Sequence, residues 1–140
     1  MPILRNTVLI DTGYLVALFS KKDRFHKAAL ALRPQIEDKI WMTTWPVITE
    51  TCHLLQSFQI ITLCERKILN LFELRTEHFS RIKTLMQKYE ELPMDLADAS
   101  LVILAEELGH GDIVSTDHRD FKTYRFKNHS PFRNLLVSPT

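Results

Sequence analysis

The stretch LPMDLADASL, from Leu92 to Leu101, predicts the start of a helix that presents two acids. Pro93 interrupts the helical pattern before it, and a new helix is expected from Asp95 to Leu108. Asp95 and Asp98 stand three residues apart, so they share one face of that helix. Apolar residues recur at helical spacing on a neighbouring face, which predicts that the helix packs into a core. We therefore expect an anchored helix that holds two carboxylates toward other acids.

The composition predicts one ordinary globular domain over residues 1–140. Of these residues, 45% are apolar and 25% are charged, which is enough to bury a sizeable core. The formal net charge is +1, so nothing in the overall charge attracts nucleic acid or membrane. Any binding to a polyanion must therefore come from a local patch. No apolar run approaches the ~20 residues that span a bilayer.

The two cysteines, Cys52 and Cys64, form no C-x-x-C pair, and no secretory signal precedes them. We therefore expect reduced thiols in a cytoplasmic protein. His53 lies next to Cys52, but no second His-Cys pair at ligand spacing supports a site for a soft metal.

Short β-branched runs alternate with helical patterns along the chain. Thr7–Ile10 predicts a central parallel strand, and the run that begins at Asp112 repeats its pattern. Ile40–Thr44 predicts a further strand. The alternation indicates an α/β fold with a parallel sheet and right-handed crossovers.

The remaining elements follow from apolar spacing. Helices are expected over 14–19, over 26–36, from about Val47, over Thr62–Leu74 and from Thr76, with a turn or two over 120–125. Further strands are expected around residues 74–78 and over Leu135–Val137.

Several acids are expected at one edge of the sheet. Asp11 and Asp117 each follow a predicted strand, and parallel strands lie about 4.8 Å apart, so the two converge if these strands are neighbours. Glu50, Asp95 and Asp98, each predicted in the first turn of a helix, begin at the same edge. Each acid also has a simpler interpretation as a helix cap, a partner of the helix dipole or a solvated side chain.

Crowded carboxylates repel one another, and a hard divalent cation relieves that repulsion. Mg²⁺ and Mn²⁺ prefer oxygen ligands, and such an ion activates water and polarises a phosphoryl oxygen. The pattern therefore indicates metal-dependent hydrolysis of a phosphodiester.

The chain resembles the PIN domain family, in particular the toxin half of VapBC-type toxin–antitoxin modules. The resemblance rests on Ile10–Leu18, Thr49-Glu50, Met94–Ala99, and Ser115–Asp117 followed by Asp120-Phe121, in the order and at the separations usual in the family. It implies a three-layer α/β/α sandwich with a central parallel sheet. It also implies an endoribonuclease that uses Mg²⁺ or Mn²⁺ on single-stranded or structured RNA, a cognate antitoxin protein as partner, and a homodimer.

The resemblance also implies the site residues. Asp11, Glu50, Asp98 and Asp117 match the four catalytic acids, and Asp95 matches an extra acid that only part of the family has. The implied metal ligands are therefore Asp11, Glu50, Asp95, Asp98 and Asp117. Asp95 has three open roles: direct ligand, ligand through water, or helix start. Ser115 stands where the family often has Thr, a hydroxyl that orients a site carboxylate.

The C-terminal part carries basic and aromatic residues that alternate. Cations near phosphates and aromatics that stack on bases suit single-stranded RNA, whereas a solvated edge with core aromatics is the alternative. His118 either touches a phosphate or is simply exposed. The residues of this patch are Arg119, Phe121, Lys122, Tyr124, Arg125, Phe126, Lys127 and Arg133.

Two other classes of protein compete with the nuclease. One is an RNA-binding or partner-binding PIN module without a toxin role, which a lost acid would favour, and none is lost. The other is a phosphatase or phosphotransfer protein with Asp11 as nucleophile. A dehalogenase-like site needs a second Asp at position 13, where this chain has Gly13. A receiver domain needs a lysine after its late strand, and Ser115–Asp117 include none.

Overall fold

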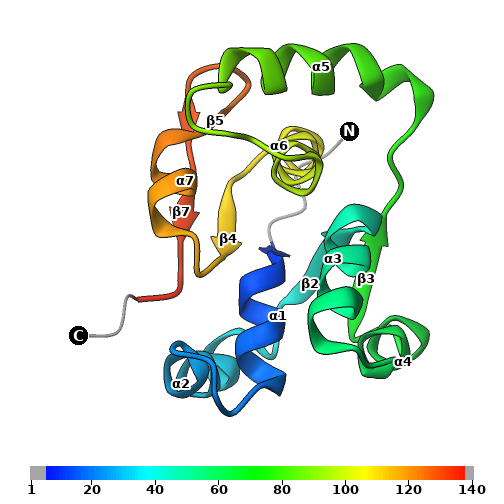
Figure 1. Ribbon diagram of the computed structural model, residues 1–140, viewed down its shortest axis with the longest axis vertical. Coiled ribbons are helices and arrows are strands. Elements are labelled where there is room, and N and C mark those ends of the chain that lie inside the picture. The colour runs from blue at the N-terminus through cyan, green and yellow to red at the C-terminus, as the bar shows by residue number, and fades with distance from the viewer. Residues whose placement is uncertain (1–5, 138–140) are drawn as a thin grey trace.

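The computed structural model describes residues 6–137 and has a five-stranded parallel sheet at its centre (Figure 1). The strand order is β3-β2-β1-β4-β7, and every neighbouring pair is parallel. Helices α5 and α6 lie on one side of the sheet, and α1 and α2 lie on the other. The predicted three-layer α/β/α fold is confirmed. No helix of the described residues is both long and apolar enough to cross a membrane.

The elements have the following bounds. The sheet contains β1 (Thr7–Ile10), β2 (Ile40–Thr44), β3 (Leu69–Phe72), β4 (Asp112–Val114) and β7 (Arg133–Asn134), and a small antiparallel pair consists of β5 (Arg125–Phe126) and β6 (Ser130–Pro131). The helices are α1 (Thr12–Phe19), α2 (His26–Ile36), α3 (Trp45–Leu55), α4 (Gln59–Glu65), α5 (Phe79–Lys88), α6 (Leu96–Leu108) and α7 (His118–Thr123), with a 3₁₀ turn at Thr76–His78.

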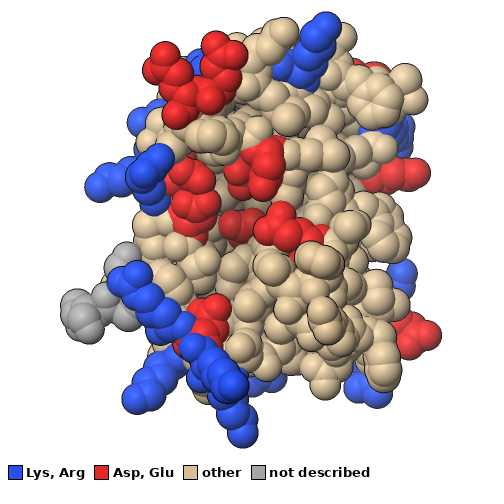
Figure 2. Space-filling model, in the orientation of Figure 1, with Lys and Arg blue, Asp and Glu red and all other residues tan. Residues whose placement is uncertain are grey.

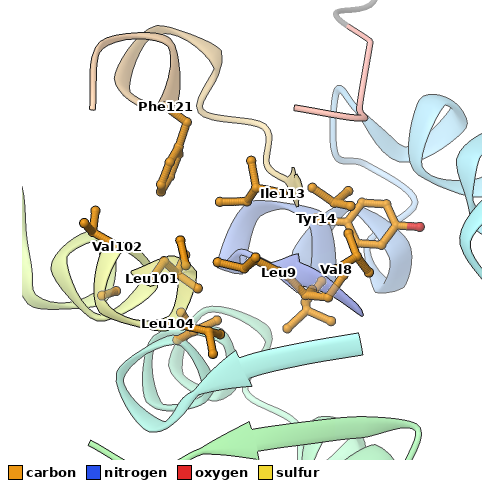
Figure 3. Close-up of a cluster of buried hydrophobic side chains, with 14 of the residues drawn as sticks. Val8, Leu9, Tyr14, Leu101, Val102, Leu104, Ile113 and Phe121 are labelled. Atoms are coloured by element: carbon orange, nitrogen blue, oxygen red, sulfur yellow. The ribbon is translucent and has the colours of Figure 1, made fainter. Parts of the chain in front are cut away.

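Strand β1 runs through the middle of the core, and all four of its residues are buried. Its side chains alternate between the two layers of helices (Figure 3): Leu9 points toward Leu101 of α6, whereas Val8 lies toward Tyr14 of α1. This central position explains why the last three residues of β1, Val8–Ile10, are all apolar rather than alternating with polar residues. The strand places its carboxyl end, and the residue that follows it, at a fixed point of the fold.

Helix α6 is buried on more than the single face that the sequence predicted. Ten of its thirteen residues are buried, because α5 and β5 cover the side that faces away from the sheet. Burial of a Leu, Ile or Val side chain contributes about 1.5–3 kcal/mol, so this helix is held firmly. The two acids at its start are therefore fixed relative to the sheet.

The segment between α3 and α5 differs from the expectation. The predicted helix over Thr62–Leu74 is wrong: α4 ends at Glu65, and Lys67 adopts a left-handed conformation with φ 61°. The apolar residues that follow form β3, in which Leu71 lies opposite Thr43 of β2. The strand expected around residues 74–78 is also wrong, since residues 76–78 form a 3₁₀ turn. An apolar run of this length fits a helix or a buried strand, and pairing with β2 decides between them.

The last strand lies earlier than predicted, at Arg133–Asn134 rather than Leu135–Val137. The Leu135 amide still donates to the Ile113 carbonyl at 2.8 Å. Beyond this point the Asn134 side chain replaces the ladder, because it accepts from the amides of Ser115 and Leu136 and donates to the Ser115 carbonyl. Side-chain pairing therefore ends the strand before the apolar run.

Candidate functional site

Strands β1 and β4 are neighbours, which brings the predicted acids to one place. Ile10 lies opposite Val114, and the Asp11 amide donates to the Val114 carbonyl at 3.1 Å. Around this point lies a pocket of about 350 Å³, open at the carboxyl edge of the sheet. All five predicted site acids line it, together with two others: Asp11, Asp23, Glu50, Asp95, Asp98, Asp117 and Asp120.

Figure 2 shows acidic side chains gathered in a hollow near the middle of this face. Lys and Arg side chains lie toward α7 and α2, whereas the surface toward α3 is largely neutral. The pocket thus has an acidic floor, a cationic side and a neutral side.

Asp11 is both the N-cap of α1 and a member of the pocket. It is 6% exposed; one carboxylate oxygen accepts from the Thr12 amide at 2.8 Å, and the other accepts from the Ser115 hydroxyl at 2.6 Å. Burial raises its pKa to about 6; the bonds from Ser115 and Thr12 lower the pKa, while the charges of Asp117 and Glu50 raise it. The capping interpretation of Asp11 is therefore correct, and it does not exclude a role in the site.

Asp95 and Asp98 form a reciprocal cap at the start of α6. The Asp98 amide donates to Asp95 Oδ1 at 2.8 Å, and the Asp95 amide donates to Asp98 Oδ2 at 3.4 Å. Asp95 is thus the N-cap rather than a first-turn residue. Asp98 is only 9% exposed, and burial raises its pKa to about 8, with further increases from the charges of Asp95, Asp11 and Asp117.

Asp117 caps α7 and brings a second acid with it. The Asp117 amide donates to Ser115 Oγ at 2.9 Å, and the Asp120 amide reaches Asp117 Oδ1 at 3.4 Å. Burial and the hydrogen bond and charge of Asp117 raise the pKa of Asp120 to about 7. Asp120 was absent from the predicted site, although its spacing from Asp117 equals that of Asp98 from Asp95 and was the signal that could have found it.

Glu50 lies in the second turn of α3, not the first, because the helix already begins at Trp45. Burial raises its pKa, and the nearby charge of Asp95 adds to that rise. The Thr12 hydroxyl lies close enough to oppose the rise, yet it makes no well-formed hydrogen bond to any described residue and is itself buried. An unpaired buried hydroxyl lowers the free energy of unfolding. The Thr12 hydroxyl is thus a polar group in the pocket wall, beside Glu50, that no described residue satisfies.

Gly13 allows α1 to approach the loop after β4. A Cβ at this position would lie 1.8 Å from Thr116 Oγ1. The absence of a side chain therefore sets the separation between the segments that carry Asp11 and Asp117.

The donor set of the pocket suits a hard cation, because its ionisable side chains are carboxylates. Burial raises the pKa values of Asp11 and Asp98, and the charges of neighbouring carboxylates raise them further; a bound cation would offset both effects. Among residues 6–137, however, no three Asp, Glu, His or Cys side chains are already arranged as a set that could hold a metal ion. The carboxylate donors of the pocket are of the kind that Mg²⁺ takes, an ion that binds one or two carboxylates directly and keeps several waters.

The aromatic residues of the C-terminal patch are part of the core. Phe121, Tyr124 and Phe126 are buried, so the interpretation that they stack on bases is wrong and the alternative is correct. Arg125 donates to three carbonyls of its own turn, and Arg133 pairs with Asp112 at 3.0 Å. The exposed cations that face solvent on α7 are Arg119 and Lys122.

His118 has a structural role rather than an exposed one. Its ring stacks on Phe25 with 5.7 Å between ring centroids, and Nε2 lies 2.7 Å from the Leu136 carbonyl. The side chain therefore links α7 to the C-terminal segment.

Comparison with known proteins agrees with this architecture. The PIN domain family model matches residues 8–127, and the chain therefore belongs to the PIN domain family. Among solved structures, the chain is similar to the crystal structure of VapC20 from Mycobacterium tuberculosis, a toxin that cleaves the sarcin-ricin loop. The two share 16% sequence identity with a TM-score of 0.68, over 80% of this chain and 91% of that chain. No curated protein has significant sequence similarity to the chain.

Proposed function

We propose that this PIN-domain protein is an endoribonuclease that depends on Mg²⁺ or Mn²⁺ and acts as the toxin of a toxin–antitoxin pair. The observation that supports the proposal is the convergence of Asp11, Glu50, Asp98 and Asp117 on one open pocket. Two of these acids, Asp11 and Asp98, are buried with raised pKa values. Crowded, buried carboxylates lower the stability of a fold, and such groups with raised pKa values are therefore typical of functional sites.

In this proposal Asp11, Asp98 and Asp117 hold the cation, with Glu50 and Asp95 at the rim of the pocket. A bound Mg²⁺ or Mn²⁺ supplies Lewis acidity toward a phosphoryl oxygen and lowers the pKa of a bound water. Asp95 also caps α6 by accepting from the Asp98 amide, a role in the fold that does not require the cation.

The residues of the chain supply orientation and proton transfer. Ser115 fixes the Asp11 carboxylate, and the capping bonds fix Asp98 and Asp117. Glu50 orients the attacking water for in-line attack and accepts its proton, and its raised pKa makes it a stronger base. Binding of a second cation is the other role that its position on the pocket wall supports.

The proposed substrate is RNA, single-stranded or structured. At 16% identity, the similarity to VapC20 supports the fold and does not identify the RNA target. Arg119 and Lys122 on α7 offer positive charge to its phosphates.

A cognate antitoxin protein and a homodimer belong to the same proposal, as do a single domain over residues 1–140 and a cytoplasmic location. Free thiols at Cys52 and Cys64 are consistent with that location.

The test is cleavage of a mixed pool of RNA with Mg²⁺ or Mn²⁺, alongside an EDTA control and two variants. Asp98→Asn removes a pocket carboxylate, and Asp112→Asn is its matched control, because Asp112 pairs with Arg133 instead of lining the pocket. We expect metal-dependent cleavage by the wild type and Asp112→Asn, and none by Asp98→Asn or with EDTA. Cleavage by Asp98→Asn at the wild-type rate, or RNA binding without any cleavage, would contradict the proposal.

A further inference from the structure

An exposed tryptophan stands beside the acidic pocket. Trp45 begins α3 and is 54% exposed, whereas Trp41, on β2, is 6% exposed and donates to the Ile36 carbonyl at 2.8 Å. Trp45 therefore contributes little to the core and leaves its ring accessible to a ligand.

Trp45 lines a shallow groove of about 560 Å³ whose wall is mainly apolar. Glu50, Asp95 and Ala97 line both this groove and the acidic pocket, so the two are continuous. The full lining of the groove is Trp45, Pro46, Thr49, Glu50, His53, Asp95, Leu96 and Ala97.

The surroundings of the acids restrict what the groove can take. Cationic side chains lie toward α7 and α2, and the neutral surface lies on the opposite side, toward α3 (Figure 2). A ligand that crosses the pocket therefore meets positive charge on one side and an exposed aromatic ring on the other. A nucleotide chain combines anionic phosphates with flat, apolar-faced bases, and unpaired bases stack on Trp in this way.

We propose that Trp45 is the platform on which an unpaired base of the RNA stacks, next to the phosphate held at the acidic pocket. The inference rests on the proposed ribonuclease function and adds a specificity element to it. Because bases must be unstacked from their neighbours to reach the ring, the groove selects single-stranded segments or loops over continuous duplex.

The binding test compares wild type, Trp45→Phe and Trp45→Leu, which keep or remove the aromatic ring while leaving an apolar side chain. The probe is a short oligouridylate with Ca²⁺ as the cation, and the control ligand is an abasic oligomer of equal length and charge. We expect Trp45→Leu to raise the Kd for oligouridylate roughly 5- to 150-fold, the range typical of one lost base–aromatic stack. Trp45→Phe restores most of the affinity, and the abasic oligomer binds all three proteins alike.

Tryptophan fluorescence gives an independent readout. Oligouridylate is expected to quench the wild type, while the Trp45→Phe protein, whose remaining Trp41 is buried, shows little change. In cleavage assays Trp45→Leu raises KM more than it lowers kcat, because the ring binds RNA without touching the reacting atoms.

Other results separate this inference from the proposed function. Equal affinity and cleavage for all three proteins would overturn the stacking platform and leave the nuclease intact. A loss of dimer in Trp45→Leu during sedimentation, with unchanged RNA binding, would show that a second copy covers the groove and would also overturn it. If the wild type neither binds nor cleaves RNA, the proposed function fails, and the platform fails with it.

Discussion

The Ser115 hydroxyl donates a 2.6 Å hydrogen bond to Asp11, 104 residues earlier in the chain, and accepts one from the Asp117 amide at 2.9 Å. One buried side chain thus joins the ends of β1 and β4. The single hydroxyl proton is directed to Asp11, where it favours the charged carboxylate. Ser115 is in this respect a positioning residue for the two strand-end acids.

Removal of that hydroxyl is expected to impair the site without removing any acid. Ser115→Ala raises the pKa of Asp11 above its present value of about 6, because a bond that favours the charged form is lost. We expect roughly 10- to 100-fold weaker cleavage and an acid limb of the pH profile that moves to higher pH. Ser115→Thr retains the hydroxyl and restores the profile. A wild-type profile in Ser115→Ala would show that Ser115 does not act through Asp11.

Neutralising a pocket acid is expected to separate activity from stability. Asp98→Asn abolishes cleavage. In EDTA above pH 8, where the Asp98 carboxyl is charged, it leaves the melting temperature unchanged or raises it, because one crowded and buried charge is gone. Asp112→Asn loses only an ion pair with the exposed Arg133 and alters the melting temperature little. Circular dichroism melts in EDTA measure both. A clear drop for Asp98→Asn would contradict a repulsive acidic cluster.

The metal-free protein is expected to lose stability as the pH rises. Asp11, Asp120 and Asp98 have folded-state pKa values of about 6, 7 and 8, above the ordinary value of 3.8. Between pH 3.8 and about 8 the folded state therefore binds more protons than the unfolded state. The stability that these three carboxyls contribute is therefore fully present below about pH 3.8 and is lost as the pH rises to about 8. Melting temperatures in EDTA across this range test the sign. Mg²⁺ or Mn²⁺ should restore stability at pH 8, and a rise with pH in EDTA would oppose the prediction.

Space between α1 and the loop after β4 is expected to limit substitution at Gly13. Gly13→Ala places a Cβ 1.8 Å from Thr116 Oγ1, so either Thr116 must change its rotamer or the segments that carry Asp11 and Asp117 must move apart, and we expect losses of both stability and cleavage. Thr116→Gly removes the atoms that clash, so the double variant should regain part of the stability and cleavage that Gly13→Ala loses. A double-mutant cycle of melting temperature and kcat measures this coupling, and additive effects would argue against a close approach that matters.

The convergence of the acids was predictable because it depends on topology more than on detail. Parallel strands end at one edge, and Asp11 and Asp117 follow two of them, so adjacency of β1 and β4 is enough. The capping roles of Asp11 and Asp95 were also apparent from the residue type. Family resemblance then indicated which acids belong together.

Other features depend on contacts that no local pattern contains. Lys67 ends α4 early, and pairing with β2 converts the next apolar residues to β3. Phe121 and Tyr124 alternate with cations in sequence but pack inward, because α7 lies against the core. The helix expected from about Val47 begins two residues earlier, so neither the position of Trp45 in α3 nor its exposure follows from the local pattern.

The proposed function requires that these buried carboxylates surround a divalent cation. Calorimetric titration with Mn²⁺ at pH 7, in two buffers of different ionisation enthalpy, tests it most directly. We predict binding with release of protons, because Asp98, with a pKa of about 8, must become charged when the cation binds, and we predict weaker binding by Asp98→Asn. No binding by the folded wild type, or binding without proton release that Asp98→Asn leaves unchanged, would contradict the account.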